Sequence, residues 1–234
     1  MNGTRIYRQF IHHEACLRVC CDQFDAVASE IVRQRKILDA YISRHPRFRT
    51  SLTPLTVSAD EPEVVRRMAL AGQRAGVGPM AAVAGAMAQL AVEAAVAAGA
   101  REAIVENGGD IYLVAAAPGT IALYTGRTPV ADRLAFSIQA ADTPIAICSS
   151  SGMMGPSYSM GKCDLATIVA RDGALADAAA TEAANRVRSE ADIDAALRAV
   201  AGIEGVDGVL LVKGERIGLM GKLPPLVRNL QGQP

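Results

Sequence analysis

Three absences limit what this sequence can encode, and the first is any block of like charge. Its 24 basic and 24 acidic residues give a formal net charge of zero. A nucleic-acid-binding surface needs clustered positive charge, so we expect no nucleic-acid partner. The second absence is a disulfide framework, because the five cysteines are an odd number and Cys20 and Cys21 are adjacent. The reduced cytoplasm is therefore the expected location.

The third absence is an apolar run at the N-terminus, so we expect no export signal. The most hydrophobic segment is instead the alanine-rich stretch 80–100, which is long enough to raise the question of a membrane span. Gln89 and Glu93 interrupt it, and alanine gives only a weak drive into lipid. We therefore expect a buried helix and no membrane partner, which leaves small molecules or other proteins as partners, with a homodimer open.

Half of the 234 residues are apolar, which is enough for a sizeable core in one domain, 1–234, or in two lobes that meet at a cleft. Blocks of helix and strand pattern alternate along the chain, so the expected fold class is α+β, with mixed α/β layers around a sheet. Helices are expected over 29–45, from a cap at Asp60, from Met80 to Gly99 and over 174–200. Strands are expected over 102–106, 110–116, 120–126, 133–139, 144–150 and 164–170, with a final hairpin that turns near Gly214. The segment 47–55 is expected to be extended, and 110–116 and 120–126 to form a hairpin through Pro118 and Gly119.

The stretch VENGGDIYLV, 105–114, breaks good strand sequence with polar residues and two glycines. Gly108 and Gly109 permit positive φ, and Asn107 and Asp110 tolerate or cap such turns. This pattern predicts either a tight hairpin or bulge, or a polar break that presents Asn107 or Asp110 to a ligand.

Asp177 and Thr181 lie four residues apart in the alanine-rich segment 174–185, so on a helix they project from one face. A carboxylate and a hydroxyl are hard oxygen ligands of the kind that Mg²⁺ accepts. The alternative is a capping aspartate and a threonine that bonds back to its own helix.

The segment CSSSGMMGPSYSMGKCD, 148–164, is dense in hydroxyls and glycine directly after a predicted strand. Such a loop offers donors to an anion and is a candidate phosphate or nucleotide cradle, although an ordinary surface loop is the alternative. It is not a P-loop, because five residues separate Gly155 from Gly161 and Cys163 follows the lysine where Ser or Thr is needed. Lys162 could pair with a phosphate or be solvated, and the commoner case for Cys148 and Cys163 is burial.

The three histidines, His12, His13 and His45, all lie in the first fifth of the chain. A site built from the later motifs therefore has no histidine base unless the N-terminus folds over it. His12 with Cys16 and Cys20 lacks the second paired element of a usual zinc site.

The phrases ENGGDI, SSSG and ADAAAT, in this order after an alanine and glycine helix, resemble the ApbE family of FAD:protein FMN transferases. The whole chain resembles a separate ApbE-like family still more closely, through RFRTSLTPL, GVGPMAAVAGAMA, VENGGDIYL, GPSYSMGKCD and ALADAAAT. The resemblance implies an ApbE-like fold, with helices packed on a largely antiparallel sheet. It also implies that Mg²⁺ and FAD are bound and that FMN is transferred to a Ser or Thr hydroxyl of an acceptor protein, with release of AMP.

The resemblance also assigns roles to residues. Asp177 and Thr181 correspond to metal ligands of the transferases, with a backbone carbonyl near Ala84 or Gly85 as a third. The remaining matched phrases and the hydroxyl-rich loop give the expected cofactor-binding residues, which are Asn107, Gly108, Gly109, Asp110, Ser150, Ser151, Gly152, Ser157 and Ser159.

Two departures from the family leave the activity open. The transferase segment that carries the histidine associated with transfer is absent, because only 24 residues separate Gly152 from Asp177. The lysine usual in the alanine and glycine helix is also missing. If the chain is a transferase, Tyr158, Lys162 or Asp164 must activate the acceptor hydroxyl in place of the histidine. The alternative is a flavin or nucleotide carrier that binds without turnover, or a protein whose site binds nothing.

Overall fold

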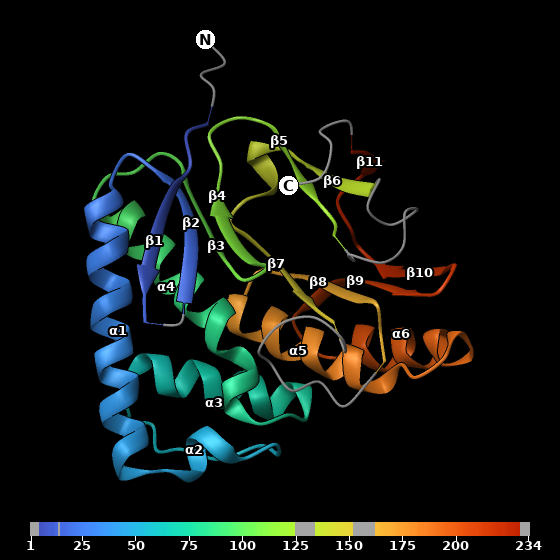
Figure 1. Cartoon of the computed structure of the whole chain (residues 1–234), viewed down its shortest axis with the longest axis horizontal. Coiled ribbons are helices and arrows are strands. Elements are labelled where there is room, and N and C mark those ends of the chain that lie inside the picture. The colour runs from blue at the N-terminus through green and yellow to red at the C-terminus, as the bar shows by residue number, and fades with distance from the viewer. Residues whose placement is uncertain (1–4, 14, 125–133, 152–161, 230–234) are drawn as a thin grey trace.

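A computed structural model describes residues 5–13, 15–124, 134–151 and 162–229. An eight-stranded sheet forms its centre, in the order β1-β2-β3-β4-β7-β8-β9-β10, and every neighbouring pair is antiparallel (Figure 1). The strands are β1 (Arg8–His12), β2 (Ala15–Cys21), β3 (Ala103–Asn107), β4 (Asp110–Val114), β7 (Ile145–Ser150), β8 (Leu165–Ala170), β9 (Val206–Lys213) and β10 (Arg216–Gly221). The expected α+β class and the largely antiparallel sheet are confirmed.

Helices cover one face of this sheet. They are α1 (Phe24–Arg44), α4 (Val83–Ala97), α5 (Gly173–Arg186) and α6 (Ile193–Ala201). Residues alternate between the two faces along each strand, so Tyr112 and Cys148 pack under the helices while Leu113 and Ile147 point to the other side. A second core lies beyond α4 and α5, where α2 (Arg47–Thr50), α3 (Glu63–Ala75) and the short 3₁₀ turn Pro79–Ala82 pack (Figure 1).

The opposite face is covered by a three-stranded sheet in the order β11-β6-β5. Its strands are β5 (Gly119–Ala122), β6 (Leu134–Ile138) and β11 (Leu226–Arg228). Phe136 and Ile138 of β6 pack with Leu113 and Ile147 of the large sheet. The predicted hairpin through Pro118 and Gly119 is therefore wrong, because β4 pairs with β3 and β7, whereas β5 crosses to the small sheet and pairs with β6.

Three smaller expectations also need correction. The segment 47–55 is extended only in its later part, since Arg47–Thr50 is a single helical turn anchored by buried Phe48. Asp60 does not cap the next helix, which begins at Glu63 after Pro62. The helical region 174–200 is two helices, because α5 ends at Arg186 and α6 starts at Ile193.

The alanine-rich segment is the helix expected to be buried. Together with the preceding 3₁₀ turn it forms Pro79–Ala97, the one helix among the described residues that is long and apolar enough to cross a membrane. Ala88, Ala91, Val92 and Ala95 of this helix are fully buried in the core between α4 and the sheet. Its apolar surface is thus used in packing within the protein.

Candidate functional site at one end of the sheet

One end of the large sheet brings together most of the predicted site residues. Antiparallel pairing places the β3–β4 turn, the end of β7 and the start of β8 at this end, because Asn107 pairs with Asp110 and Ser150 with Ala166. The β9–β10 turn at Gly214 lies there as well, since Leu165 pairs with Val212. The first turns of α4 and α5 approach the same end, with Asn107 Nδ2 3.5 Å from the carbonyl oxygen of Ala84. Segments from three distant parts of the chain therefore meet here.

The motif ENGGD forms the tight hairpin between β3 and β4. Gly108 and Gly109 have φ values of 66° and 104°. Positive φ at both central residues is what a two-residue type I′ hairpin requires, and only glycine adopts it without strain. The hairpin alternative is thus confirmed. It also presents polar groups, because Asn107 and Asp110 lie on the face of the sheet that the helices cover, in line with buried Val105 and Tyr112.

Helices α4 and α5 cross at a contact between two glycines, Gly85 and Gly173. A Cβ added at Gly85 would lie 2.0 Å from the Gly173 carbonyl oxygen, and one added at Gly173 would lie 2.7 Å from the Gly85 carbonyl oxygen. No side chain larger than hydrogen fits between helices this close. The small residues of both segments therefore bring two helix N-termini together at the end of the sheet.

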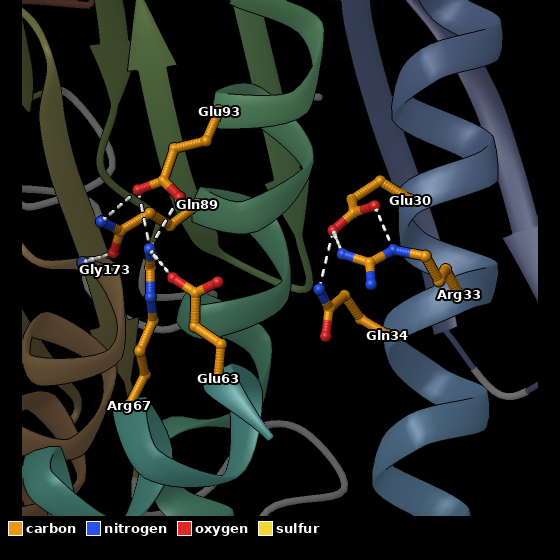
Figure 2. Close-up of polar contacts among 8 residues, drawn as sticks. All are labelled: Glu30, Arg33, Gln34, Glu63, Arg67, Gln89, Glu93 and Gly173. Carbon is orange, nitrogen blue, oxygen red and sulfur yellow. Dashed lines mark hydrogen bonds and ion pairs between the residues drawn. The ribbon is translucent and has the colours of Figure 1, made fainter. Parts of the chain in front are cut away.

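Each of these two helices supplies a side chain to the first turn of the other. Asp177 Oδ2 of α5 accepts a hydrogen bond of 2.9 Å from the backbone N–H of Gly85 in α4. Gln89 Oε1 of α4 accepts one of 2.7 Å from the N–H of Gly173 in α5 (Figure 2). The cap within α5 itself is Asp172, which accepts from Leu175. Asp177 is thus a cap, as one alternative proposed, but it caps the neighbouring helix.

Asp110 and Asp177 form a buried acidic pair, the term used below for these two side chains. Their relative exposures are 7% and 9%. Burial is the main cause that raises the pKa of Asp177 to about 7, against the N–H groups of Gly85 and Ala84. Burial and then the charge of Asp177 raise the pKa of Asp110 well above its usual range, opposed by the Cys148 thiol and by the backbone at Ser149. Negative charge on either member of the pair is therefore poorly solvated.

No ion pair between described residues brings a positive side chain to this pair. The eight ion pairs that join described residues to one another each bring a lysine or arginine to a carboxylate outside this pair. Asp110 Oδ1 is buried and has no hydrogen-bond partner among the described residues. Buried carboxylates are normally paired, hydrogen-bonded or bound to a metal, so an unpartnered oxygen here is a sign of a missing ligand.

The donors around the pair suit a hard cation such as Mg²⁺. Carboxylate oxygens, a threonine hydroxyl and a backbone carbonyl are its usual ligands. Thr181 lies one turn beyond Asp177 on α5. Of the two candidate carbonyls, that of Gly85 faces Gly173, whereas that of Ala84 faces Asn107. No group of three or more His, Cys, Asp or Glu side chains among the described residues could hold a metal, so these mixed oxygen donors are the set to consider.

The serine segment begins beside the acidic pair. Ser150 lies on the same face of β7 as Cys148, which is buried under the helices, whereas Ser149 points to the other face and shares a hydrogen bond of 2.9 Å with Thr167. Ser151 follows directly. The predicted residues Gly152, Ser157, Tyr158 and Ser159 lie outside the described residues.

Lys162 and Asp164 are held away from the acidic pair by other contacts. The N–H of Lys162 donates to the carbonyl of Val187, at the far end of α5. Ten residues of helix separate Val187 from Asp177, a rise of about 15 Å. Asp164 accepts from Lys213 Nζ at 3.1 Å and from the N–H of Gly214 at 2.7 Å, so its carboxylate fastens the β9–β10 turn. Their predicted catalytic roles remain predictions.

The N-terminal histidines reach the same end of the sheet but not the acidic pair. His12 ends β1 and His13 follows in the β1–β2 turn with a φ of 52°. Strands β2 and β3 lie between this turn and β4, which carries Asp110. His45 is remote, because it ends α1 and stacks on Tyr41.

Two residues of the site had no sequence signal strong enough to assign them. In the sequence Gln89 is only a polar interruption of an apolar segment, yet it caps α5 and also bonds to Glu93 through Nε2 at 2.9 Å. Cys148 was expected to be buried, as it is, but its position opposite Asp110 follows from the pairing of β4 with β7. A polar residue in the middle of an alanine helix was the one available signal for Gln89.

Residues 8–206 match the family model described as AbpE bacteria. The chain belongs to this family. It is similar to a UPF0280 protein of Methanocella arvoryzae, with 44% identity over 198 residues that cover 85% of this chain and 80% of the relative. A UPF0280 protein of Methanosarcina acetivorans is 42% identical over 203 residues, which cover 86% and 80%. The ApbE-like family expected from the motifs is confirmed.

Solved structures of ApbE share the fold of this AbpE-family protein. The apo form of the Pseudomonas stutzeri flavinyl transferase ApbE matches with a TM-score of 0.52 and 11% identity, over 93% of this chain and 94% of that one. The H257G mutant of the flavin transferase ApbE from Vibrio cholerae matches with a TM-score of 0.51 and 13% identity, over 93% and 97%. At this level of identity the likeness concerns the fold, and the activity must be argued from the site.

Proposed function

We propose that this protein is a Mg²⁺-dependent flavin transferase that binds FAD, or a closely related dinucleotide, at the acidic end of the sheet and transfers the FMN part to a hydroxyl of an acceptor protein. The observation that carries the proposal is the buried, uncompensated acidic pair at the crossing of α4 and α5, in a fold shared with ApbE. Asp177 and Thr181, with the carbonyl of Ala84 or Gly85, would hold the metal.

Dependence on a cation follows from charge. A diphosphate is an anion, and the acidic pair would repel it. The helix N-termini offer little compensation, because the N–H of Gly85 is taken by Asp177 and that of Gly173 by Gln89. A divalent cation held by Asp177 would offset the charges of the protein and of the diphosphate and would polarise the phosphoryl oxygens. The protein groups left to hold the nucleotide are Asn107, the Gly108–Gly109 turn, Ser150 and Ser151, with Gly152, Ser157 and Ser159.

Transfer breaks one bond and forms one. The acceptor hydroxyl oxygen attacks the phosphorus of the FMN half, the bond from that phosphorus to the bridging oxygen breaks, and AMP leaves with that oxygen. The hydroxyl proton must pass to a base, for which Tyr158, Lys162 and Asp164 are the candidates. Asp164 already accepts two hydrogen bonds, so it would act only after exchanging one of them.

The second candidate function is a flavin or nucleotide carrier without turnover. The observation that favours it is the position of the histidines, since none of the three lies at the acidic pair. A carrier needs only the binding groups, whereas a transferase also needs the base.

Incubation with FAD in the presence and absence of Mg²⁺ separates these functions. Flavin fluorescence reports binding, an AMP assay reports cleavage, and mass spectrometry of cell-extract proteins reports an FMN adduct. AMP release with an adduct supports the transferase, and flavin binding without AMP supports the carrier. Absence of flavin binding would contradict both. In Asp177→Asn we expect Mg²⁺-dependent binding to weaken at least tenfold, and unchanged dependence would leave Asp177 as a helix cap alone.

A further inference from the structure

The acidic pair holds one carboxylate more than the cation site assigned above requires. That site takes a single carboxylate, from Asp177, together with a hydroxyl and a carbonyl. Asp110 comes from a different element, the first residue of β4, and its side chain lies under the helices with 7% exposure. Its role must therefore be explained separately from that of Asp177.

A structural role accounts for only part of the Asp110 side chain. Aspartate at the end of a two-residue turn often accepts backbone N–H groups. Here the Cys148 thiol and the backbone at Ser149 lower the pKa of the carboxyl group, yet Oδ1 remains buried and has no hydrogen-bond partner among the described residues. Leaving a buried charged oxygen unsatisfied is costly, and asparagine would form the same turn without that charge. The charge itself therefore calls for an explanation.

The surroundings of Oδ1 suit a cation and not an anion. The charged group that shifts the pKa of Asp110 is Asp177, another carboxylate, and its effect raises that pKa. The Cys148 thiol, which also influences the Asp110 carboxyl group, donates to the carbonyl oxygen of Gly173 at 3.7 Å. None of these groups brings a positive charge, so an anion would find only repulsion.

We infer that Asp110 is a second carboxylate ligand of the divalent cation, so that Asp110 and Asp177 together bind the cation before any nucleotide arrives. Two carboxylates match the charge of a divalent ion, which offsets the cost of burying each of them. Mg²⁺ is commonly held by one or two carboxylates, with substrate phosphates completing the shell. A site with Asp177 alone would leave a net positive charge and would depend on the diphosphate for its affinity. The second carboxylate removes that dependence.

The inference concerns the same site as the proposed function and rests on it, but it is tested without flavin. The probe is Mn²⁺ in place of Mg²⁺, because the electron paramagnetic resonance signal of free Mn²⁺ is lost on binding. The full chain and its Asp110→Asn variant are titrated in nucleotide-free buffer. Asp207→Asn is the matched control, because Asp207 is exposed on β9 and its substitution removes the same charge.

We expect the wild-type chain and Asp207→Asn to bind Mn²⁺ with dissociation constants within twofold of each other, and Asp110→Asn to bind at least tenfold more weakly. Equal affinity in Asp110→Asn, or no binding of millimolar Mn²⁺ by the wild-type chain, would overturn the inference. Circular dichroism and gel filtration check that each variant folds, and Asp110→Ser replaces Asp110→Asn if the latter does not.

The melting temperature of Asp110→Asn gives a second readout. It changes in opposite directions if Asp110 is a cation ligand and if it only holds the turn. In EDTA at pH 7 the folded chain must either bury the Asp110 charge beside Asp177 or take up a proton there, and Asp110→Asn removes that cost, so we expect the melting temperature to rise by a few degrees. If Asp110 serves only to hold the turn, the same substitution lowers the melting temperature. Failure of FAD to bind would contradict the proposed function and leave both of these cation measurements intact.

Discussion

Two clusters of paired acids lie along helix α4, and they differ in their burial and in the presence of a positively charged side chain. At its first turn, Gly85 faces the acidic pair, where no lysine or arginine of the described chain is bound. Two turns later Glu93 meets Arg67, which also binds Glu63, so one guanidinium lies between two carboxylates (Figure 2). Arg67 bonds Glu93 from Nη1 and Nη2, each at 2.9 Å.

The difference separates a structural cluster from a candidate functional one. The Arg67 cluster satisfies its own charges and joins α3 to α4, and through Gln89 it continues to the first turn of α5. The acidic pair is more deeply buried and yet lacks its counter-charge. Buried ionisable groups that destabilise the folded protein are commonly found at functional sites. The experiments below alter one cluster or the other.

The largest expected effect comes from the glycine contact on which both clusters depend. In Gly85→Ala the new methyl group would lie 2.0 Å from the carbonyl oxygen of Gly173 and 2.8 Å from Cβ of Asp177. Helices α4 and α5 must then separate, which breaks the hydrogen bond from Gly85 to Asp177 and that from Gly173 to Gln89. We expect a loss of about 3 kcal/mol or more in the free energy of unfolding, measured by urea denaturation.

Gly202→Ala is the matched control for that substitution. Gly202 ends α6 with a φ of −79°, and an added Cβ would meet its nearest atom, the carbonyl oxygen of Arg198, at 3.3 Å. We expect a change within about 0.5 kcal/mol. An equally small loss in Gly85→Ala would mean that α4 and α5 can move apart at little cost. The glycine contact would then not be what holds the residues of the two clusters in place.

The next largest effect is a pH dependence that the acidic pair has and the Arg67 cluster lacks. The folded protein holds protons on Asp177, with a pKa of about 7, and on Asp110, whose pKa is raised well above its usual range. The unfolded chain releases them near pH 4. Between about pH 4 and pH 7 the folded state therefore binds more protons, and stability falls as the pH rises. In EDTA we expect a loss of about 2 kcal/mol from pH 5 to pH 7.

The double variant Asp110→Asn, Asp177→Asn isolates this contribution. Carboxyl groups with lowered pKa values, such as Glu30 and Glu102, change protonation below this window and are the same in both proteins. The variant should lose most of the slope between pH 5 and pH 7. A slope unchanged from the wild type would show that the acidic pair does not hold these protons.

The sequence was sufficient for the parts of the site that depend on local geometry. Two successive glycines predicted the turn at 108–109, and the spacing of four placed Asp177 and Thr181 on one helical face. Family motifs supplied the fold and the order of the elements. The residues of each pattern lie within a few positions of one another, so each pattern can be interpreted without knowledge of tertiary contacts.

What the sequence could not supply were relations between distant segments. The turn after β4 looked like a hairpin, but β5 leaves to cover the opposite face of the sheet, and that choice depends on where Phe136 and Ile138 need burial. Asp177 could be recognised as a cap, but not as the cap of a helix that begins more than 90 residues earlier. The absence of a counter-charge at Asp110 among the described residues likewise depends on tertiary contacts that the sequence does not show.

The smallest expected effect tests whether removing the arginine makes the Arg67 cluster resemble the acidic pair. Arg67→Met leaves Glu63 and Glu93 together without their guanidinium, although both side chains are 40–50% exposed and water screens them. We expect a loss of about 1 kcal/mol, measured by urea denaturation. Arg33→Met is the control on α1. Gln34 donates to Glu30 at 2.7 Å, and this hydrogen bond remains after the arginine is removed (Figure 2). The loss should therefore stay below about 0.5 kcal/mol.

Added Mn²⁺ should not restore the stability of Arg67→Met, because water already solvates its two carboxylates. Rescue by Mn²⁺ would show that any two neighbouring acids on this scaffold bind the cation, and the depth of burial at Asp110 and Asp177 would then lose its meaning as a mark of the site.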